Sequence, residues 1–300
     1  MRYKVSHTTS YAYATPVDLA SHMLHLLPRA VPGQSVISAE LAADPLPGRV
    51  THALDHFGNH VSWMFLDRRH DNFDVTLTAE VKVMFAPPPP VLATLAWEQV
   101  AALAQAGNDG AWQAAEFCFD SPMLPFEQAA GAYVAPSFPA GRPVLEGLLD
   151  LNGRIRKEFS FKAGVTNVQT TVAKVLSQRA GVCQDFTHLM IAGLRAIGLP
   201  ARYVSGYLRT KPPVGQPVRR GADQSHAWVG AWMGPDHGWV DLDPTNDLVV
   251  RDEHVVLAYG RDYGDISPVR GVILGGGRHS VTVGVDLEAV EELGASSDLT

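Results

Sequence analysis

Cys183 stands where a thiol could act as a nucleophile. Gly181 permits a tight approach of the chain, and an apolar helix is expected to begin at or just after the cysteine. Backbone N–H groups and the positive end of the helix dipole would then face the sulfur, which favours a thiolate. The same N–H groups could hold a developing oxyanion. A buried structural cysteine is the alternative interpretation of this position.

A histidine and two carboxylates lie on an expected hairpin that could supply the base. Two strand-like segments flank the turn sequence Gly-Pro-Asp-His-Gly. If Met233 opposes Gly238 across this turn, Asp243 becomes the diagonal neighbour of His226 on the same face. Asp241 shares that face and competes for the role. A shift of one residue would move the carboxylate to the other face, so the register decides the prediction.

Cysteine, histidine and a carboxylate can act together as a nucleophile, a base and a group that orients the base. His226 would take the thiol proton and return it to the leaving group. Asp243 would hold the imidazole tautomer and stabilise the imidazolium. A histidine that only packs on a sheet face is the alternative, but its combination with a cysteine at a helix start favours catalysis.

Three further residues are candidates for the substrate cleft. Gln184 follows the cysteine directly, and Trp228 and Trp239 lie on the two strands of the hairpin. Both tryptophans could equally belong to the core. The loop at residues 211–220 contains lysine, arginine and proline; it could flank the cleft and meet an acidic substrate group, although a solvated loop is the default interpretation.

The elements that must position these groups fall into two parts. Residues 1–86 are rich in β-branched and aromatic residues with a period of two, which predicts a β-rich N-terminal domain. Four prolines at 87–90 exclude a helix interior or a central strand, so we place a proline-rich linker at 87–96. We predict a catalytic domain at 97–290 and a flexible tail at 291–300.

Within the predicted catalytic domain, hydrophobic periodicity and Gly or Pro breaks define the expected elements. Helices are expected at residues 97–105, 111–119, 145–159, 170–178 and 183–197. The last of these is apolar on most sides, which predicts a buried helix. Strands are expected at 201–208, 225–233, 239–243, 248–260 and 279–287. Glycines at 275–277 are followed by a strand, which favours a hairpin over a phosphate-binding loop.

Composition excludes several classes of protein. The chain has 300 residues, of which 46% are hydrophobic and 18% charged, so it can bury a sizeable core. A formal net charge of −7 does not favour binding to the negatively charged backbone of nucleic acid. No apolar run is long enough to span a membrane. The first seven residues contain no apolar signal region, and two cysteines form no disulfide framework. We therefore expect a cytoplasmic protein.

The remaining thiol and histidines are interpreted as structural. Cys118 is flanked by phenylalanines, which predicts a buried and inert thiol. His188 follows Cys183 by five residues and faces away from the sulfur, so packing is favoured. His52, His56 and His60 recur every four residues, as metal ligands on a helix would, but Phe-Gly-Asn between them breaks such a helix.

The motifs around these residues resemble the bacterial transglutaminase-like superfamily, whose members are often described as cysteine proteases. The resemblance lies in residues 181–188, 198–207, 225–229, 238–239 and 243–246. Residues 3–17 and 57–59 resemble the β-rich domain that precedes this core in many bacterial members. A stretch at 260–271 resembles the segment that follows it.

This resemblance implies an α+β protein with a papain-like or transglutaminase-like core, in which a helix bearing the cysteine packs on an antiparallel sheet. It assigns the nucleophile to Cys183, the base to His226 and the orienting carboxylate to Asp243, in preference to Asp241. Animal transglutaminases use calcium, but the sequence has no EF-hand loop and no dense acidic ligand set. We therefore predict no metal and no cofactor.

The predicted activity is thiol-dependent acyl transfer at an amide or peptide bond, and the expected partner is a peptide or amide substrate. We expect water to resolve the acyl-enzyme, which describes a cysteine peptidase or amidase. Resolution by an amine would instead make the protein a protein-glutamine transamidase with the same triad. A non-catalytic binding module is the alternative of another class, disfavoured because all three triad residues are present.

Overall fold

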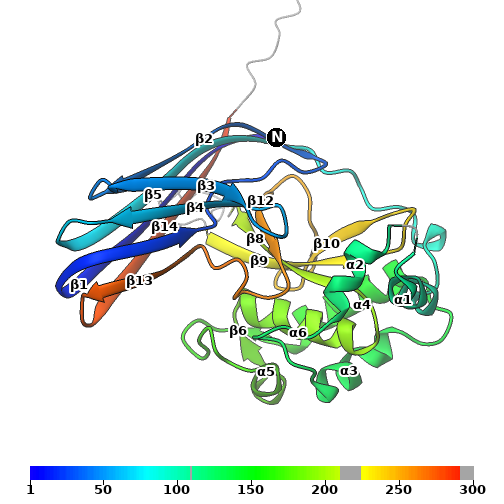
Figure 1. Ribbon diagram of the computed structural model, residues 1–300. Helices are drawn as coiled ribbons and strands as arrows, with labels where there is room; N and C mark the ends of the chain where they lie inside the picture. The colour runs from blue at the N-terminus through cyan, green and yellow to red at the C-terminus, as the bar shows by residue number, and fades with distance from the viewer. Residues whose placement is uncertain (109, 210–223, 291–300) are drawn as a thin grey trace, which may run out of the picture.

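The computed structural model describes residues 1–108, 110–209 and 224–290 (Figure 1). The predicted cleft loop at 211–220 and the predicted tail at 291–300 lie outside these residues. Strands at both ends of the described chain form one sheet, and the middle of the chain forms a second sheet covered by helices. The α+β class and the β-rich N-terminal region predicted from the sequence are confirmed.

The N-terminal sheet is built around one long strand. Its strands are β1 (Arg2–Leu24), β2 (Gln34–Asp44), β3 (Arg49–Leu54), β4 (His60–Leu66) and β5 (His70–Val83), in the order β2-β5-β1-β4-β3. Two C-terminal strands, β13 (Val269–Gly275) and β14 (His279–Val290), also pair with β1. The first half of β1 therefore lies between β5 and β14.

This pairing differs from the predicted domain boundary. The range 97–290 assigned the last two strands to the catalytic domain, whereas β13 and β14 complete the sheet of the N-terminal region. The hairpin expected at the glycines 275–277 is not formed, because β13 and β14 pair with consecutive parts of β1 and not with each other. The three glycines, all with positive φ, connect the two strands, and Gly276 bonds to Thr15 and Pro16 of β1. Alternation along a strand shows that it is half-buried, but it does not show which distant strand is its partner.

Helices fill the middle of the chain. They are α1 (Trp97–Ala106), α2 (Trp112–Ala115), α3 (Gln128–Val134), α4 (Val144–Glu158), α5 (Val172–Gln178) and α6 (Cys183–Ala196), with 3₁₀ turns at Val91–Ala93, Glu116–Cys118 and Ala135–Ser137. The predicted helix 111–119 divides into α2 and a 3₁₀ turn. α3 was not predicted, because it spans only two turns. It packs closely on α6, where a Cβ added at Gly193 would lie 2.1 Å from Val134.

The second sheet is antiparallel and carries α6 on one face. Its strands are β8 (Ala201–Leu208), β9 (Gln224–Trp232), β10 (Trp239–Asp243), β11 (Leu248–Val249) and β12 (His254–Gly260), in the order β11-β10-β9-β8-β12. The predicted strand at 248–260 thus divides in two. α6 packs on β8 and β9, and every residue from Asp185 to Arg195 is buried. The buried character predicted for this helix is confirmed.

Side-chain amides join the two sheets. Gln34 on β2 both donates to the carbonyl of Val256 and accepts from its N–H, each at 2.8 Å. Asn59 makes the same pair of bonds to Tyr259, at 2.7 and 2.8 Å. Because all four bonds are buried, they hold β12 firmly against the N-terminal region. In the described parts of the chain, no helix is both long enough and apolar enough to cross a bilayer.

Candidate active site

Cys183 is the first residue of α6, and the chain before it is held on both sides. Gly181 lies in the short strand β7 (Ala180–Gly181), which pairs with β6 (Ser160–Phe161). The buried Asp185 carboxylate accepts from the Val182 N–H at 2.7 Å and from the Thr166 hydroxyl at 2.6 Å. A Cβ added at Gly181 would lie 2.6 Å from this carboxylate, so the tight approach expected of the glycine is observed. The thiol therefore has a fixed place at the helix N-terminus.

The hairpin has the register that the sequence analysis assumed. Trp239 pairs with Trp232, and the Met233 N–H donates to the Gly238 carbonyl at 2.7 Å. This places Asp243 diagonally opposite His226, and the ring Nε2 lies 2.8 Å from the carboxylate Oδ2. Both side chains are buried. Two groups separated by 17 positions in the chain are thus joined by one short charged hydrogen bond.

The carboxylate of Asp243 is itself held by the turn that follows its strand. Its Oδ1 accepts from the backbone N–H groups of Thr245 and Asn246, at 2.9 and 3.3 Å. Its Oδ2 accepts from the Asn246 amide at 2.7 Å, in addition to His226. This is an Asx turn, in which an aspartate at a strand end bonds to the backbone two residues on.

Asp241, the competing carboxylate, has other partners. Its Oδ2 accepts from the Trp228 indole N–H at 3.1 Å, and its Oδ1 lies 3.8 Å from the Arg202 guanidinium. Asp241 therefore holds Trp228 and Arg202 in place, whereas the partner of His226 is Asp243.

The pairing changes the charge states of both groups. Burial alone would lower the pKa of His226, but hydrogen bonds and charge from Asp243 and Cys183 outweigh it and raise that pKa to about 10. Burial would raise the pKa of Asp243, but its hydrogen bonds to two histidines and its proximity to the His226 charge hold that pKa below the ordinary range. An imidazolium beside Cys183 at neutral pH follows from these shifts.

The raised pKa of His226 predicts a pH-dependent stability. The ordinary pKa is 6.5 and the folded value about 10, so the stabilisation is complete below pH 6.5 and is lost as pH rises toward 10. The depressed pKa of Asp243 acts oppositely, and its contribution is lost on acidification below its ordinary 3.8. We expect His226→Gln to destabilise the protein most between pH 3.8 and pH 6.5, and progressively less as the pH rises from 6.5 toward 10. Urea unfolding across this range measures the difference, and a constant difference up to pH 10 would contradict the assignment.

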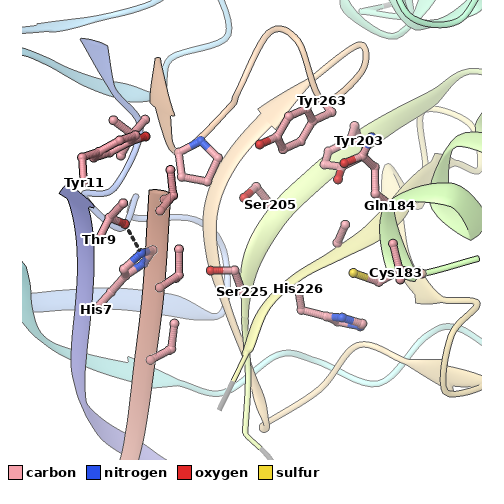
Figure 2. A pocket seen from close by; sticks show the side chains of 17 residues that line it. His7, Thr9, Tyr11, Cys183, Gln184, Tyr203, Ser205, Ser225, His226 and Tyr263 are labelled. Carbon is pink, nitrogen blue, oxygen red and sulfur yellow. Dashed lines mark hydrogen bonds between the residues drawn. The ribbon is translucent and has the colours of Figure 1, made fainter. Parts of the chain in front are cut away.

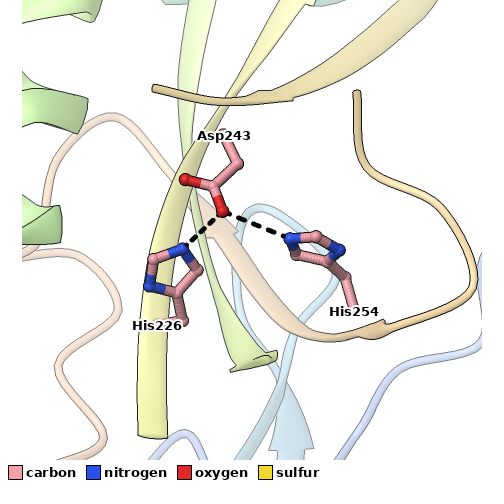
Figure 3. A group of neighbouring side chains, drawn as sticks. All are labelled: His226, Asp243 and His254. Atoms are coloured by element: carbon pink, nitrogen blue, oxygen red, sulfur yellow. Dashed lines mark hydrogen bonds and ion pairs between the residues drawn. The ribbon is translucent and has the colours of Figure 1, made fainter. Parts of the chain in front are cut away.

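A second histidine reaches the same carboxylate. His254 at the start of β12 places its Nε2 3.4 Å from Asp243 Oδ2 (Figure 3). Its ring also packs edge-on against Trp228, with the ring centres 5.1 Å apart. The side chain is buried, and its Nδ1 has no hydrogen-bond partner among the described residues. The sequence analysis missed His254, because β12 is separated from β10 by two strands in the sheet and no local pattern joins them. A histidine directly after the polar Arg-Asp-Glu stretch was the only local signal.

The same three side chains could in principle hold a metal ion. One ligand atom from each of His226, Asp243 and His254 lies within 4.8 Å of the others. In the structure both imidazoles bond to the same carboxylate oxygen, so the nitrogens that would bind a metal already have a hydrogen-bond partner. These facing atoms therefore form a hydrogen-bond network, while His254 Nδ1 on the far side of its ring has no partner among the described residues.

The thiol and imidazole open into a cavity of about 730 Å³. Figure 2 shows Cys183, Gln184 and His226 on one side of it and side chains of β1 on the other. Gln184, the predicted cleft residue, lines the cavity and donates from its amide to the Val168 carbonyl at 3.2 Å. The cavity thus joins both sheets of the protein.

The two tryptophans predicted for the cleft do not line this cavity. Trp228 is fully buried, and its indole N–H donates to the Asp241 carboxylate. Trp239 packs edge-on against Phe117 at 5.4 Å and under the Arg202 guanidinium. Their prediction as cleft residues is corrected: both pack against other side chains, and neither lines this cavity.

The remaining candidates occupy structural positions. Cys118 lies 3.5 Å from the Gly198 carbonyl, and burial raises the pKa of its thiol to about 11. His188 accepts from the Tyr263 N–H at 3.3 Å, and burial lowers its pKa to about 4. The three spaced histidines lie on β3, a turn and β4, so they share no helix face.

Two family descriptions match the chain. Residues 3–82 match the bacterial transglutaminase-like N-terminal region, and residues 135–244 match the transglutaminase-like superfamily. The second match includes all three residues of the Cys183 site.

Relatives of similar length exist in mycobacteria. An uncharacterized protein of Mycobacterium tuberculosis is 40% identical over 299 residues, covering 97% of this chain and 93% of the relative. A shorter match, 33% over 88 residues, covers 29% of this chain and 13% of a protein-glutamine gamma-glutamyltransferase of Pseudomonas aeruginosa.

The fold also matches a solved structure. A Cytophaga hutchinsonii protein, named a "Putative Cysteine Protease", superposes with a TM-score of 0.75 at 22% identity, covering 97% of this chain and 91% of that one. At this identity the likeness concerns the fold.

Proposed function

The chain belongs to the transglutaminase-like superfamily, a family of thiol-dependent enzymes, and from this premise we propose that Cys183, His226 and Asp243 form a triad for acyl transfer from an amide or peptide bond. The observation that carries the proposal is the hydrogen bond of 2.8 Å between His226 and Asp243 beside a thiol at a helix N-terminus. Together the three residues supply a nucleophile, a proton carrier and a group that orients the carrier.

In the proposed reaction the Cys183 thiolate attacks the carbonyl carbon of the substrate. The carbonyl oxygen becomes an oxyanion that backbone N–H groups at the start of α6 stabilise. His226 gives its proton to the leaving amine as the C–N bond breaks, which leaves an acyl-enzyme. Water then attacks with His226 as the base, releasing a carboxylic acid and the free thiol. Asp243 keeps the imidazole oriented throughout.

We propose hydrolysis as the outcome, so that the protein is a peptidase or amidase. The cysteine protease name of the full-length structural neighbour supports this direction. Resolution by an amine is the second candidate, and the transferase name of the Pseudomonas aeruginosa relative supports it. Both outcomes share every step up to the acyl-enzyme.

A glutamine peptide mixed with a labelled primary amine separates the two outcomes. Mass spectrometry would detect peptide cleavage or deamidation as hydrolysis and a covalently attached amine as transamidation, with Cys183→Ala as the blank. We expect hydrolysis to dominate. Amine incorporation in excess of hydrolysis would replace the peptidase proposal with the transamidase one.

Thiol alkylation separates an enzyme from a binding module. A thiolate held by His226 should react with iodoacetamide rapidly at about pH 7, whereas an unactivated thiol reacts slowly below its ordinary pKa of about 8.5. Cys118 is the internal control, because burial raises its pKa to about 11. Labelling of Cys183 no faster than that of Cys118 would favour the binding module.

His254 is expected to act as a positioning residue for the triad. Loss of its bond to Asp243 in His254→Ala should lower kcat by about tenfold, the lower end of effects seen when groups supporting an active site are removed. His254→Gln keeps an N–H donor and should recover part of the rate, with KM little changed in both variants. A loss of thermal stability in both variants with unchanged kcat would show that His254 serves packing alone.

A further inference from the structure

This inference rests on the proposed function and concerns the opposite wall of the cavity. We propose that one face of the β1–β14 strand pair binds the substrate and selects an uncharged, apolar substituent next to the bond that Cys183 attacks. Three cross-strand pairs form this face, which we call the valine wall: His7 with Val285, Thr9 with Val283 and Tyr11 with Val281.

The register of the two strands places all six side chains on the same face. Residues two apart along a strand share a face, and directly opposed residues in a pair share it too. All six line the cavity of about 730 Å³ that also contains Cys183 and His226. Figure 2 shows His7, Thr9 and Tyr11 across this cavity from the thiol. The N-terminal sheet is thus part of the site.

The valine wall is closed at one end and open at the other. His7 and Val285 are each 1% exposed, whereas Val283 is 51% and Val281 47% exposed. Two large apolar side chains therefore face solvent inside a cavity, where contact with an apolar ligand would remove their surface from water. An apolar substituent reaching from Cys183 along the wall would cover them.

The described residues that line the cavity offer no ion-pair partner to a charged substituent on the wall. None of these residues is aspartate, glutamate, lysine or arginine, and His226 is already paired with Asp243. Burial lowers the pKa of His7 to about 4, which keeps this ring neutral. Both its nitrogens are occupied, by the Tyr207 hydroxyl at 2.7 Å and the Thr9 hydroxyl at 2.9 Å. A charged group on the wall would lose hydration without compensation.

The wall is also fixed in position. The buried amide bonds from Gln34 and Asn59 to β12 hold the N-terminal sheet against the second sheet. β12 pairs with β8, which contributes Tyr203 and Ser205 to the same cavity. A preformed wall requires little ordering when the substrate binds, which favours selectivity.

Alkylating probes that differ only in their substituent test the valine wall. The probes are iodoacetamide, its N-hexyl derivative and its N-(5-carboxypentyl) derivative, and the measured quantity is the second-order rate of alkylation at Cys183. In the wild type we expect the hexyl probe to react about tenfold faster than iodoacetamide, from burial of its methylenes, and the carboxylate probe to show no such gain.

Variants of the wall supply the second comparison. Val283→Asp should remove the preference for the hexyl probe, while the volume-matched Val283→Thr should reduce it in part. Val272→Asp is the matched control: this valine lies in the same sheet, on β13, is 79% exposed and does not line the cavity. It should leave the preference unchanged.

The outcomes separate the two proposals. Slow reaction of all probes at pH 7 would count against the activated thiol. The ratio of the hexyl to the carboxylate rate is therefore also measured near pH 9, where an ordinary thiol with a pKa of about 8.5 reacts. This ratio tests the valine wall even if the thiol is not activated at pH 7. Equal rates for the two probes, or equal effects of Val283→Asp and Val272→Asp, would overturn the valine wall as a specificity element.

Discussion

Replacing Cys183 with serine is expected to lower the rate of amide or ester cleavage by at least about 10⁴-fold, the scale of loss when a catalytic nucleophile is removed. A hydroxyl is much less acidic than a thiol, so the neighbouring imidazolium would not hold it as an anion. The serine is close in size and polarity, and the Asp185 bond to the Val182 N–H that fixes the helix start remains. The loss should therefore appear in kcat, with thermal stability little changed.

Release of p-nitrophenol from an activated ester measures this loss. Cys118→Ser is the matched control, since this thiol lies outside the cavity and donates to the Gly198 carbonyl, which a serine hydroxyl can also do. It should retain the wild-type rate. Equal rates for Cys183→Ser and the wild type, or a larger loss in Cys118→Ser, would contradict the assignment of the nucleophile.

Asp243→Asn is expected to lower kcat by about 10³- to 10⁴-fold, the scale found when an asparagine replaces the triad aspartate. An amide does not stabilise the imidazolium of His226 and can hold the ring in the wrong tautomer. The amide oxygen can still accept from the Thr245 and Asn246 N–H groups, so the turn after β10 should be retained. The pKa of His226, now about 10, should fall at the same time.

Asp241→Asn is the matched comparison, because Asp241 lies two residues away on the same strand. Its bond to the Trp228 indole can be replaced by an amide oxygen, and it has no contact with His226. We expect a loss of less than about tenfold, within the range of ordinary structural substitutions. Titration of His226 by NMR in both variants provides an independent readout. A larger loss in Asp241→Asn would reverse the assignment of the orienting carboxylate.

Local sequence signals predicted much of the architecture around the site. Glycine at 181 and the apolar pattern after Cys183 predicted the start of α6, and Gly-then-Pro at 198–200 predicted its end. The turn sequence at 234–238 predicted a hairpin, and the register assumed for it, which places Asp243 beside His226, is the observed one. These features are predictable because each depends on residues within a few positions or on one short turn.

Features that depend on distant pairing were not predictable in this way. β14 shows the alternation of a strand, but nothing local assigns β13 or β14 to β1, at the opposite end of the chain. The tryptophans at 228 and 239 lie on the expected strands, yet other side chains cover them and neither lines the cavity. A period of two distinguishes the two faces of a strand without showing what covers each face.

The sequence by itself determined the chemistry of the site: a thiol at a helix start, an imidazole and a carboxylate held in register by one hairpin. Tertiary structure decided what surrounds that chemistry. It brought His254 from the far strand of the sheet to Asp243, and it placed the valine wall opposite Cys183. The physical reason is the distance along the chain over which the determining interactions act. Hairpin register follows from local backbone geometry, whereas sheet partners and cavity walls follow from packing of the whole chain.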